Sequence, residues 1–197
     1  MMKKLNRFAV VALGFLTLTS SLTSCLSDSD NKNEITKEQA IAAVKAMKGT
    51  YTGKVTSTLG NTQTTETTPN QTWESDVKLK IPAFRLAPIA STLDNTYADL
   101  RQALDDKKTV ECTAQYSIVK LESGVTYFGL YPDNIEFDVT YGGNKHRVAL
   151  AFAQAQYGGT FMTASKNMAF SMVVSNLYLD NKRISTFPQV LYTYRTK

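Results

Sequence analysis

The stretch VECTAQYSI (Val110–Ile118) decides the fold of this 197-residue chain. Every second residue in it is apolar, and the positions between hold Glu111, Thr113, Gln115 and Ser117. Alternation of this length predicts a β-strand that buries one face and leaves the other in water. A helix would instead repeat its apolar residues at intervals of three and four.

Similar strand patterns fill most of the chain, and turn residues separate them. They lie at 50–56, 73–81, 125–131, 135–141, 146–152, 168–179 and 190–194. With residues 110–118 they make about eight strands, and the short connections favour antiparallel neighbours in meander order. We therefore expect a mainly β, barrel-like domain, because closure removes exposed strand edges, with a two-sheet sandwich as the alternative.

One segment, Thr62–Thr72, is rich in threonine and poor in apolar residues, and Pro69-Asn70 interrupts it. It predicts either a polar edge hairpin that leads into the next strand or a loop. We favour the hairpin.

Two helices complete the expected fold. Thr36 and Gln39 match a capping box ahead of an apolar stripe, which predicts a short helix before the first strand. A second helix, inserted between strands, is expected to begin at Ser91 or Thr92 and to cover an open edge or one end of the sheet. Its apolar face would consist of Leu93, Tyr97, Leu100 and Leu104.

The chain begins with a different kind of signal. A positively charged start precedes an apolar run, Phe8–Leu18, which is shorter than the roughly 20 residues that a membrane-spanning helix needs. The following Leu22-Thr23-Ser24-Cys25 resembles the bacterial lipoprotein processing box, in which the chain is cut before the cysteine and the thiol is acylated. This resemblance implies that residues 1–24 are a signal peptide and that Cys25 is the lipid attachment site.

A short acidic, serine-bearing tract, Leu26–Asn31, follows directly. It resembles the surface-export signal of Bacteroidetes lipoproteins, and it equally has the composition of a solvated linker. We expect residues 25–35 to be the lipidated cysteine and a flexible polar tether, and residues 36–197 to be a single β-rich domain. The expected location is the cell envelope, as an outer-membrane lipoprotein that an export signal would place on the cell surface.

The charge and cysteine counts change when the signal peptide is removed. It carries three basic residues and no acidic one, so the net charge falls from +5 to +2. That small excess does not support a nucleic-acid partner, which needs clustered Lys and Arg. Once Cys25 is acylated, Cys112 has no partner for an intramolecular disulfide, and we expect it to be a small buried residue.

No recognisable catalytic motif stands in the sequence. The one histidine, His146, lacks the second histidine or cysteine pair of a zinc site, and there is no Gly-x-Ser-x-Gly elbow or phosphate-binding glycine loop. A pair of carboxylates could act in acid–base catalysis, but Glu136 and Asp138 lie on the polar face of one expected strand, and nothing favours Glu111 or Asp76 as a catalytic residue. We expect a protein that is not an enzyme and that uses no cofactor and no metal.

Ten tyrosines are the most suggestive remaining feature, and many lie in the C-terminal strands. Their plain interpretation is cross-strand packing, with the hydroxyl groups at the rim of the barrel. The alternative is a pocket at the barrel mouth for a small apolar or glycan ligand, lined by Tyr116, Tyr127, Tyr141 and Tyr192.

The lipoprotein start, the first helix running into Gly49-Thr50-Tyr51-Thr52-Gly53, and the β-rich remainder resemble small uncharacterised Bacteroides lipoproteins that are grouped as a domain of unknown function. The resemblance covers most of the mature chain and implies a lipocalin-like or related β fold, but it brings no functional residue. We expect a lipid-anchored binding or accessory module. The alternative is a structural or adhesion component that contacts other proteins at the cell surface.

Replacing the acylated cysteine tests the anchor. We expect Cys25→Ala to release the protein from membranes, because the acyl chains hold it there, whereas Cys112→Ala should leave it attached. Cell fractionation and metabolic labelling with a fatty acid measure both effects. Continued membrane association of Cys25→Ala, with no acyl label on the wild type, would contradict the prediction.

Overall fold

The computed structural model describes residues 34–60 and 64–196, and the predicted signal peptide and Cys25 lie outside the described residues. From Ile35 onward the chain forms one compact unit. Its strands are β1 (Gly49–Leu59), β2 (Thr64–Ser75), β3 (Leu79–Arg85), β4 (Thr109–Glu122), β5 (Val125–Pro132), β6 (Ile135–Tyr141), β7 (Asn144–Phe152), β8 (Ala155–Met162), β9 (Asn167–Leu179), β10 (Lys182–Arg183) and β11 (Val190–Thr196). Its helices are α1 (Lys37–Met47), α2 (Ala87–Ala90), the short 3-10 helix η2 (Asn95–Tyr97) and α3 (Ala98–Lys107).

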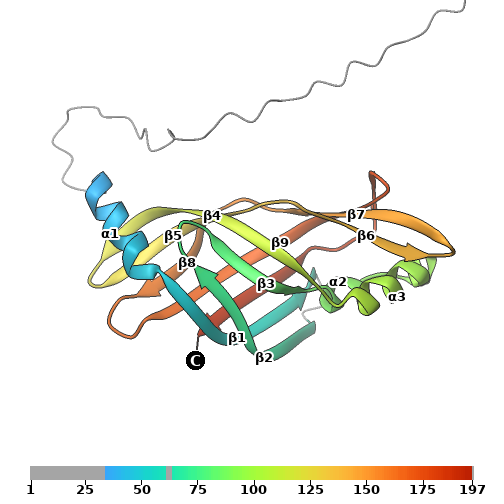
Figure 1. Ribbon diagram of the computed structural model, residues 1–197, viewed down its shortest axis with the longest axis horizontal. Coiled ribbons are helices and arrows are strands. Elements are labelled where there is room, and N and C mark those ends of the chain that lie inside the picture. Colours follow the sequence, from blue (N-terminus) through green and yellow to red (C-terminus); the bar gives the residue numbers. More distant parts are fainter. Residues whose placement is uncertain (1–33, 61–63, 197) are drawn as a thin grey trace, which may run out of the picture. The chain divides into compact units, whose positions relative to one another are not determined.

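Eight of these strands close into an antiparallel barrel in the order β1, β2, β3, β4, β5, β8, β9 and β11 (Figure 1). Closure depends on β11, which pairs with β1 along one edge and with β9 along the other. The barrel strands follow one another in chain order. The predicted barrel-like meander is therefore confirmed, and the sandwich alternative is not adopted.

The hairpin of β6 and β7 lies outside the barrel. β8 pairs with the first part of β9, from Asn167 to Phe170, and β7 pairs with the last part, from Val174 to Leu179. α3 packs against β6, the last strand of the sheet, and Lys107 Nζ lies 5.4 Å from the ring centre of Phe137. The sequence did not predict this extension of the barrel wall.

The helix between the strands begins later than predicted. Ser91 and Thr92 donate hydroxyl hydrogen bonds back to carbonyl groups of α2, at 2.8 and 2.7 Å, and therefore belong to the end of that helix. Asp94 then caps η2, and α3 starts at Ala98. The predicted apolar face is nevertheless buried at Leu93, Leu100 and Leu104 and half-buried at Tyr97.

The threonine-rich segment forms a strand from Thr64 onward, since β2 pairs with β1 along its length. A register shift at Pro69-Asn70 interrupts this pairing, and Asn70 has a φ of 56°. In the described chain, β2 pairs with β3 only through Glu74 and Ser75. Most of the β2 edge that faces β3 therefore has no neighbouring strand.

Aromatic side chains fill the interior of the barrel. The ring of the fully buried Trp73 lies 5.6 Å from that of Phe170 and 5.7 Å from that of Tyr194. Further along the barrel, the ring centres of Phe84 and Tyr192 lie 4.5 Å apart. Aromatic pairs at these distances stabilise a core beyond the burial of their surface. The rings occupy the space in which other barrels of this size hold a small ligand.

Substitution of Gly53 tests how tightly β1 packs against β11 and the indole. A Cβ atom at this position would lie 2.0 Å from the carbonyl oxygen of Arg195 and 2.8 Å from Cη2 of Trp73. We expect Gly53→Ala to lower the free energy of unfolding by about 3 kcal/mol or more, measured by chemical denaturation. Gly124→Ala is the control: a Cβ there meets nothing within 4 Å, and only its positive φ should cost about 1 kcal/mol. Equal losses in the two variants would show that the packing is loose.

Candidate functional site

Contacts at its C-terminus hold α1 at one end of the barrel. The predicted capping box of Thr36 and Gln39 starts the helix. In its last turn, the fully buried Met47 accepts a hydrogen bond from the hydroxyl of Tyr51 at 2.5 Å through its carbonyl oxygen. Lys166, in the turn between β8 and β9, also donates to a carbonyl oxygen of this turn, at 3.3 Å. These contacts fix the helix beside the barrel rather than across its interior.

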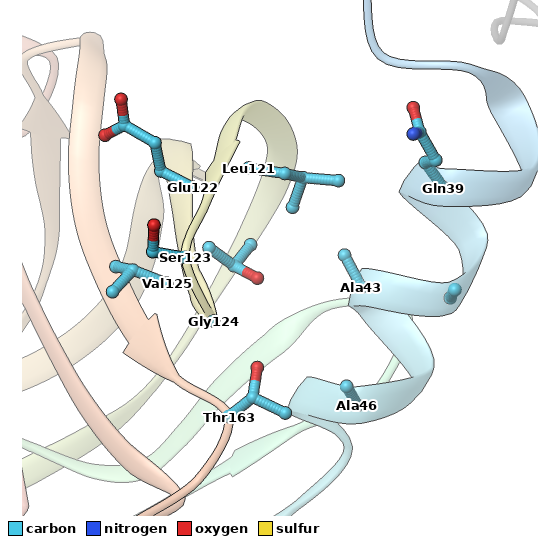
Figure 2. A pocket seen from close by; sticks show the side chains of 11 residues that line it. Gln39, Ala43, Ala46, Leu121, Glu122, Ser123, Gly124, Val125 and Thr163 are labelled. Atoms are coloured by element: carbon cyan, nitrogen blue, oxygen red, sulfur yellow. The ribbon is translucent and has the colours of Figure 1, made fainter.

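The hairpin of β4 and β5 faces α1. Its turn contains Ser123 and Gly124, both with positive φ (44° and 81°), and such two-residue turns fit the twist of paired strands. A turn is expected here, because the strand patterns at 110–118 and 125–131 are separated at this place. Leu121, just before it, directs its side chain towards α1 (Figure 2).

A groove of about 400 Å³ separates α1 from this hairpin (Figure 2). Its walls are formed by Gln39, Ala42, Ala43 and Ala46 of α1, by residues 121–126 of the hairpin, and by Thr163. The methyl groups of the three alanines leave the space open, because any longer side chain on this face would enter it. The groove offers mainly apolar contact, with an amide, a carboxylate and hydroxyl groups around it, and its size is that of a small-ligand site.

Sequence reasoning missed this groove. Its two walls lie about 80 positions apart in the chain, and no local pattern pairs them. The one available signal was the alanine at three of five consecutive positions, 42–46, on an otherwise amphipathic helix. That signal alone is also typical of a helix that packs closely against a neighbour.

Two of the four tyrosines that were predicted to line a pocket point into the barrel. Tyr192 is fully buried, and its hydroxyl donates to the carbonyl oxygen of Arg85 at 2.9 Å. Burial raises the pKa of this phenol far above its usual range, so it stays neutral. Tyr116 is half-buried nearer the α1 end, where its hydroxyl donates to the carbonyl oxygen of Asp76. Both hydroxyl groups are thus engaged with the backbone.

The other two tyrosines lie elsewhere. Tyr127 is on the outer face of β5, because Thr126 and Phe128 on either side are buried, and Lys120 Nζ lies 5.8 Å from its ring centre. Tyr141 is at the end of the β6–β7 hairpin and stacks on His146 at 4.0 Å. The structure therefore does not bring the four tyrosines together in one pocket.

His146 fastens the β6–β7 hairpin to the turn after β9. Its Nδ1 lies 2.8 Å from a carboxylate oxygen of Asp180, and its ring stacks on Tyr141. The hydrogen bond from His146, followed by one from the backbone N–H of Arg147, lowers the pKa of the Asp180 carboxyl. The position of His146 is thus explained by its packing between neighbouring segments of the sheet.

The carboxylates considered as acid–base candidates all form surface ion pairs. Glu136 pairs with Arg147 on the neighbouring strand, and Asp138 pairs with Lys145 at 2.8 Å. The other two pairs join Glu111 to Lys80 at 2.9 Å and Asp76 to Lys48 at 3.1 Å. Exposed pairs of this kind contribute little to stability.

Cys112 is buried and free, as predicted. Burial, followed by the nearby charges of Asp133 and Glu111, raises the pKa of its thiol to about 12. A thiol in this state is unreactive at neutral pH.

The described residues contain no cluster of three or more His, Cys, Asp or Glu side chains placed to hold a metal ion. Across residues 34–60 and 64–196, no helix has the length and apolar character needed to cross a membrane.

Comparison with known proteins gives a single result. A family model described as a domain of unknown function (DUF4840) matches residues 46–179, from the end of α1 to the end of β9. No curated protein and no solved structure matches the chain.

Proposed function

Since this chain belongs to the DUF4840 family, whose function is unknown, we propose a function from its own geometry. The protein is a non-enzymatic binding module that Cys25 anchors to the cell envelope through lipid. Its ligand is a small apolar molecule, or a glycan that presents an apolar face, and it binds in the groove between α1 and the β4–β5 hairpin.

The groove is the observation that carries this proposal. Small-molecule sites are typically mostly apolar and bordered by a few polar groups, and the groove, which is open to solvent on one side, has both properties. Its walls are preformed, because buried Met47 anchors the C-terminal end of the helix wall and paired strands form the hairpin wall. A preformed wall lowers the entropic cost of binding.

The barrel interior supports ligand binding less well. A ligand there would have to displace Trp73, Tyr192 and their neighbours, whose side chains are fully buried. Loss of the packing around one such aromatic side chain lowers the free energy of unfolding by about 3 to 5 kcal/mol. A small ligand would have to offset this loss before it gained any affinity. We therefore place the ligand outside the barrel, and the predicted tyrosines contribute mainly to packing.

The free edge of β2 favours a second candidate function, contact with other proteins at the cell surface. Between Thr64 and Trp73 this edge has no neighbouring strand in the described chain, and such an edge can accept an additional strand. Arg85 on β3 spans the gap and donates to Glu66 at 2.7 Å, so the opening is partly covered by one ion pair.

Filling the groove tests the first function. Ala42 lines the groove and is exposed, so Ala42→Phe should occupy the space without disturbing the core. We expect a member of a panel of fatty acids, phospholipids and short glycans to raise the Tm of the wild type by several degrees, and this shift should disappear in Ala42→Phe. Ala98→Phe, at an exposed position of α3, is the matched control and should keep the shift. No shift with any compound, or an unchanged shift in Ala42→Phe, would exclude the groove.

A photoreactive side chain tests the second function. Introduced in place of Thr65 on the exposed edge of β2, it should give covalent adducts with a protein partner in intact cells. The same group in place of exposed Thr186 is the control and should give none. Equal adducts from both positions would show that the edge has no special role.

A further inference from the structure

One end of the barrel gathers α1 and several turns (Figure 1). The turn between β2 and β3 reaches α1 through Asp76, whose carboxylate lies 3.1 Å from Nζ of Lys48. The turn between β8 and β9 reaches it through Lys166, which donates to the last turn of the helix. The groove brings the β4–β5 hairpin to the same place. We refer to this group, α1 and residues 76–78, 121–125 and 162–166, as the α1 end.

The α1 end exposes large apolar side chains. Of the four exposed large apolar side chains in the described chain, three lie here: Val77 at 78%, Ile41 at 52% and Met162 at 50%. The fourth, Tyr131 at 39%, is on the outer face of β5. Single exposed apolar residues are ordinary, but a concentration of them on separate elements at one end marks a contact surface.

Lysines without an ion-pair partner in the described chain lie beside these residues, together with the acidic Glu38, Asp76 and Glu122. Lys37 and Lys45 on α1 pair with no acidic side chain among the described residues, and neither does Lys166. Lys166 is the only charged residue of the β8–β9 turn, residues 163–166. Lysines beside exposed apolar groups are typical of a surface that contacts anionic headgroups while its apolar groups enter the interface.

The length of chain between Cys25 and Ile35 is a further argument for a membrane surface. Ten positions separate Cys25 from Ile35, where the compact unit begins, and an extended segment of that length reaches at most about 35 Å. An acylated Cys25 would therefore keep α1, the first element of the unit, within reach of the bilayer. This step rests on the lipid anchor of the proposed function.

We propose that the α1 end is a membrane-docking face, and that its partner is the surface of the anionic bilayer to which the chain is anchored. Ile41, Val77 and Met162 enter the headgroup region, and the lysines of α1 contact lipid phosphates. The groove lies at this same end, so its ligand enters from the lipid phase. The β9–β10 turn lies at the opposite end of β9 from the β8–β9 turn, and it faces away from the membrane.

Site-specific fluorescence on the acylated protein tests this orientation. Cys25 is consumed by acylation, and Cys112 is buried with a thiol pKa of about 12, so a newly introduced surface cysteine takes the label alone. Val77→Cys places the fluorophore at the α1 end. Ser185→Cys, exposed just after β10, is the matched control at the far end. Both variants are reconstituted in vesicles of phosphatidylcholine and phosphatidylglycerol that contain a brominated phospholipid.

We expect the lipid quencher to reduce the fluorescence of the label at position 77 at least about threefold more than that of the label at position 185. Equal quenching of vesicle-bound protein would overturn the docking face and leave the anchor intact. Protein that does not sediment with the vesicles would instead contradict the anchor, so the two failures are distinguishable. Strong quenching at position 185 alone would show the opposite orientation.

Charge reversal tests whether the lysines of α1 contact lipid phosphates. Lys37→Glu with Lys45→Glu should reduce quenching at position 77 in anionic vesicles and change little in phosphatidylcholine alone. Lys182→Glu with Arg183→Glu, on exposed β10, is the matched control and should have no effect. If the α1 variant is quenched as strongly as the wild type in anionic vesicles, the lysines of α1 do not contact lipid phosphates, and this part of the proposal is overturned.

Discussion

The pairing of β11 with both β1 and β9 is the constraint on which the rest of the structure depends. It converts a sheet into a closed wall of eight strands, and a barrel of that size has room for side chains or for one small ligand. Here aromatic rings around Trp73 take that room. Because the interior is committed to stability, surfaces for other molecules have to lie outside it, at the ends and edges of the barrel.

The features that the sequence predicted correctly are those that neighbouring residues determine. Alternation at 110–118 marks a half-buried strand wherever that strand pairs, and Thr36 with Gln39 can form a capping box without any distant contact. The turn at Ser123-Gly124 is local in the same sense. These signals were sufficient for the fold class, because eight strands with short connections have few other ways to bury one face.

The features that the sequence did not predict depend on residues that are distant in the chain. Tyr127 faces outward because Phe128 and Leu130, the alternate set in β5, are buried instead, and a shift of one residue exchanges the faces of a strand. The β6–β7 hairpin leaves the barrel because β7 pairs with the second half of β9, and alternation does not specify which strand will be the partner. The groove beside α1 needs two segments that only the finished fold brings together.

The position of β11 as the last barrel strand in chain order has a consequence for synthesis. Until Val190–Thr196 has emerged, β1 and β9 both lack the neighbour that closes the wall, and the aromatic interior stays open to water. Contacts between the first and last strands are also the most distant in sequence, and such contacts form slowly. A chain that is synthesised from its N-terminus thus cannot complete its fold midway, and the barrel closes only when its last strand becomes available.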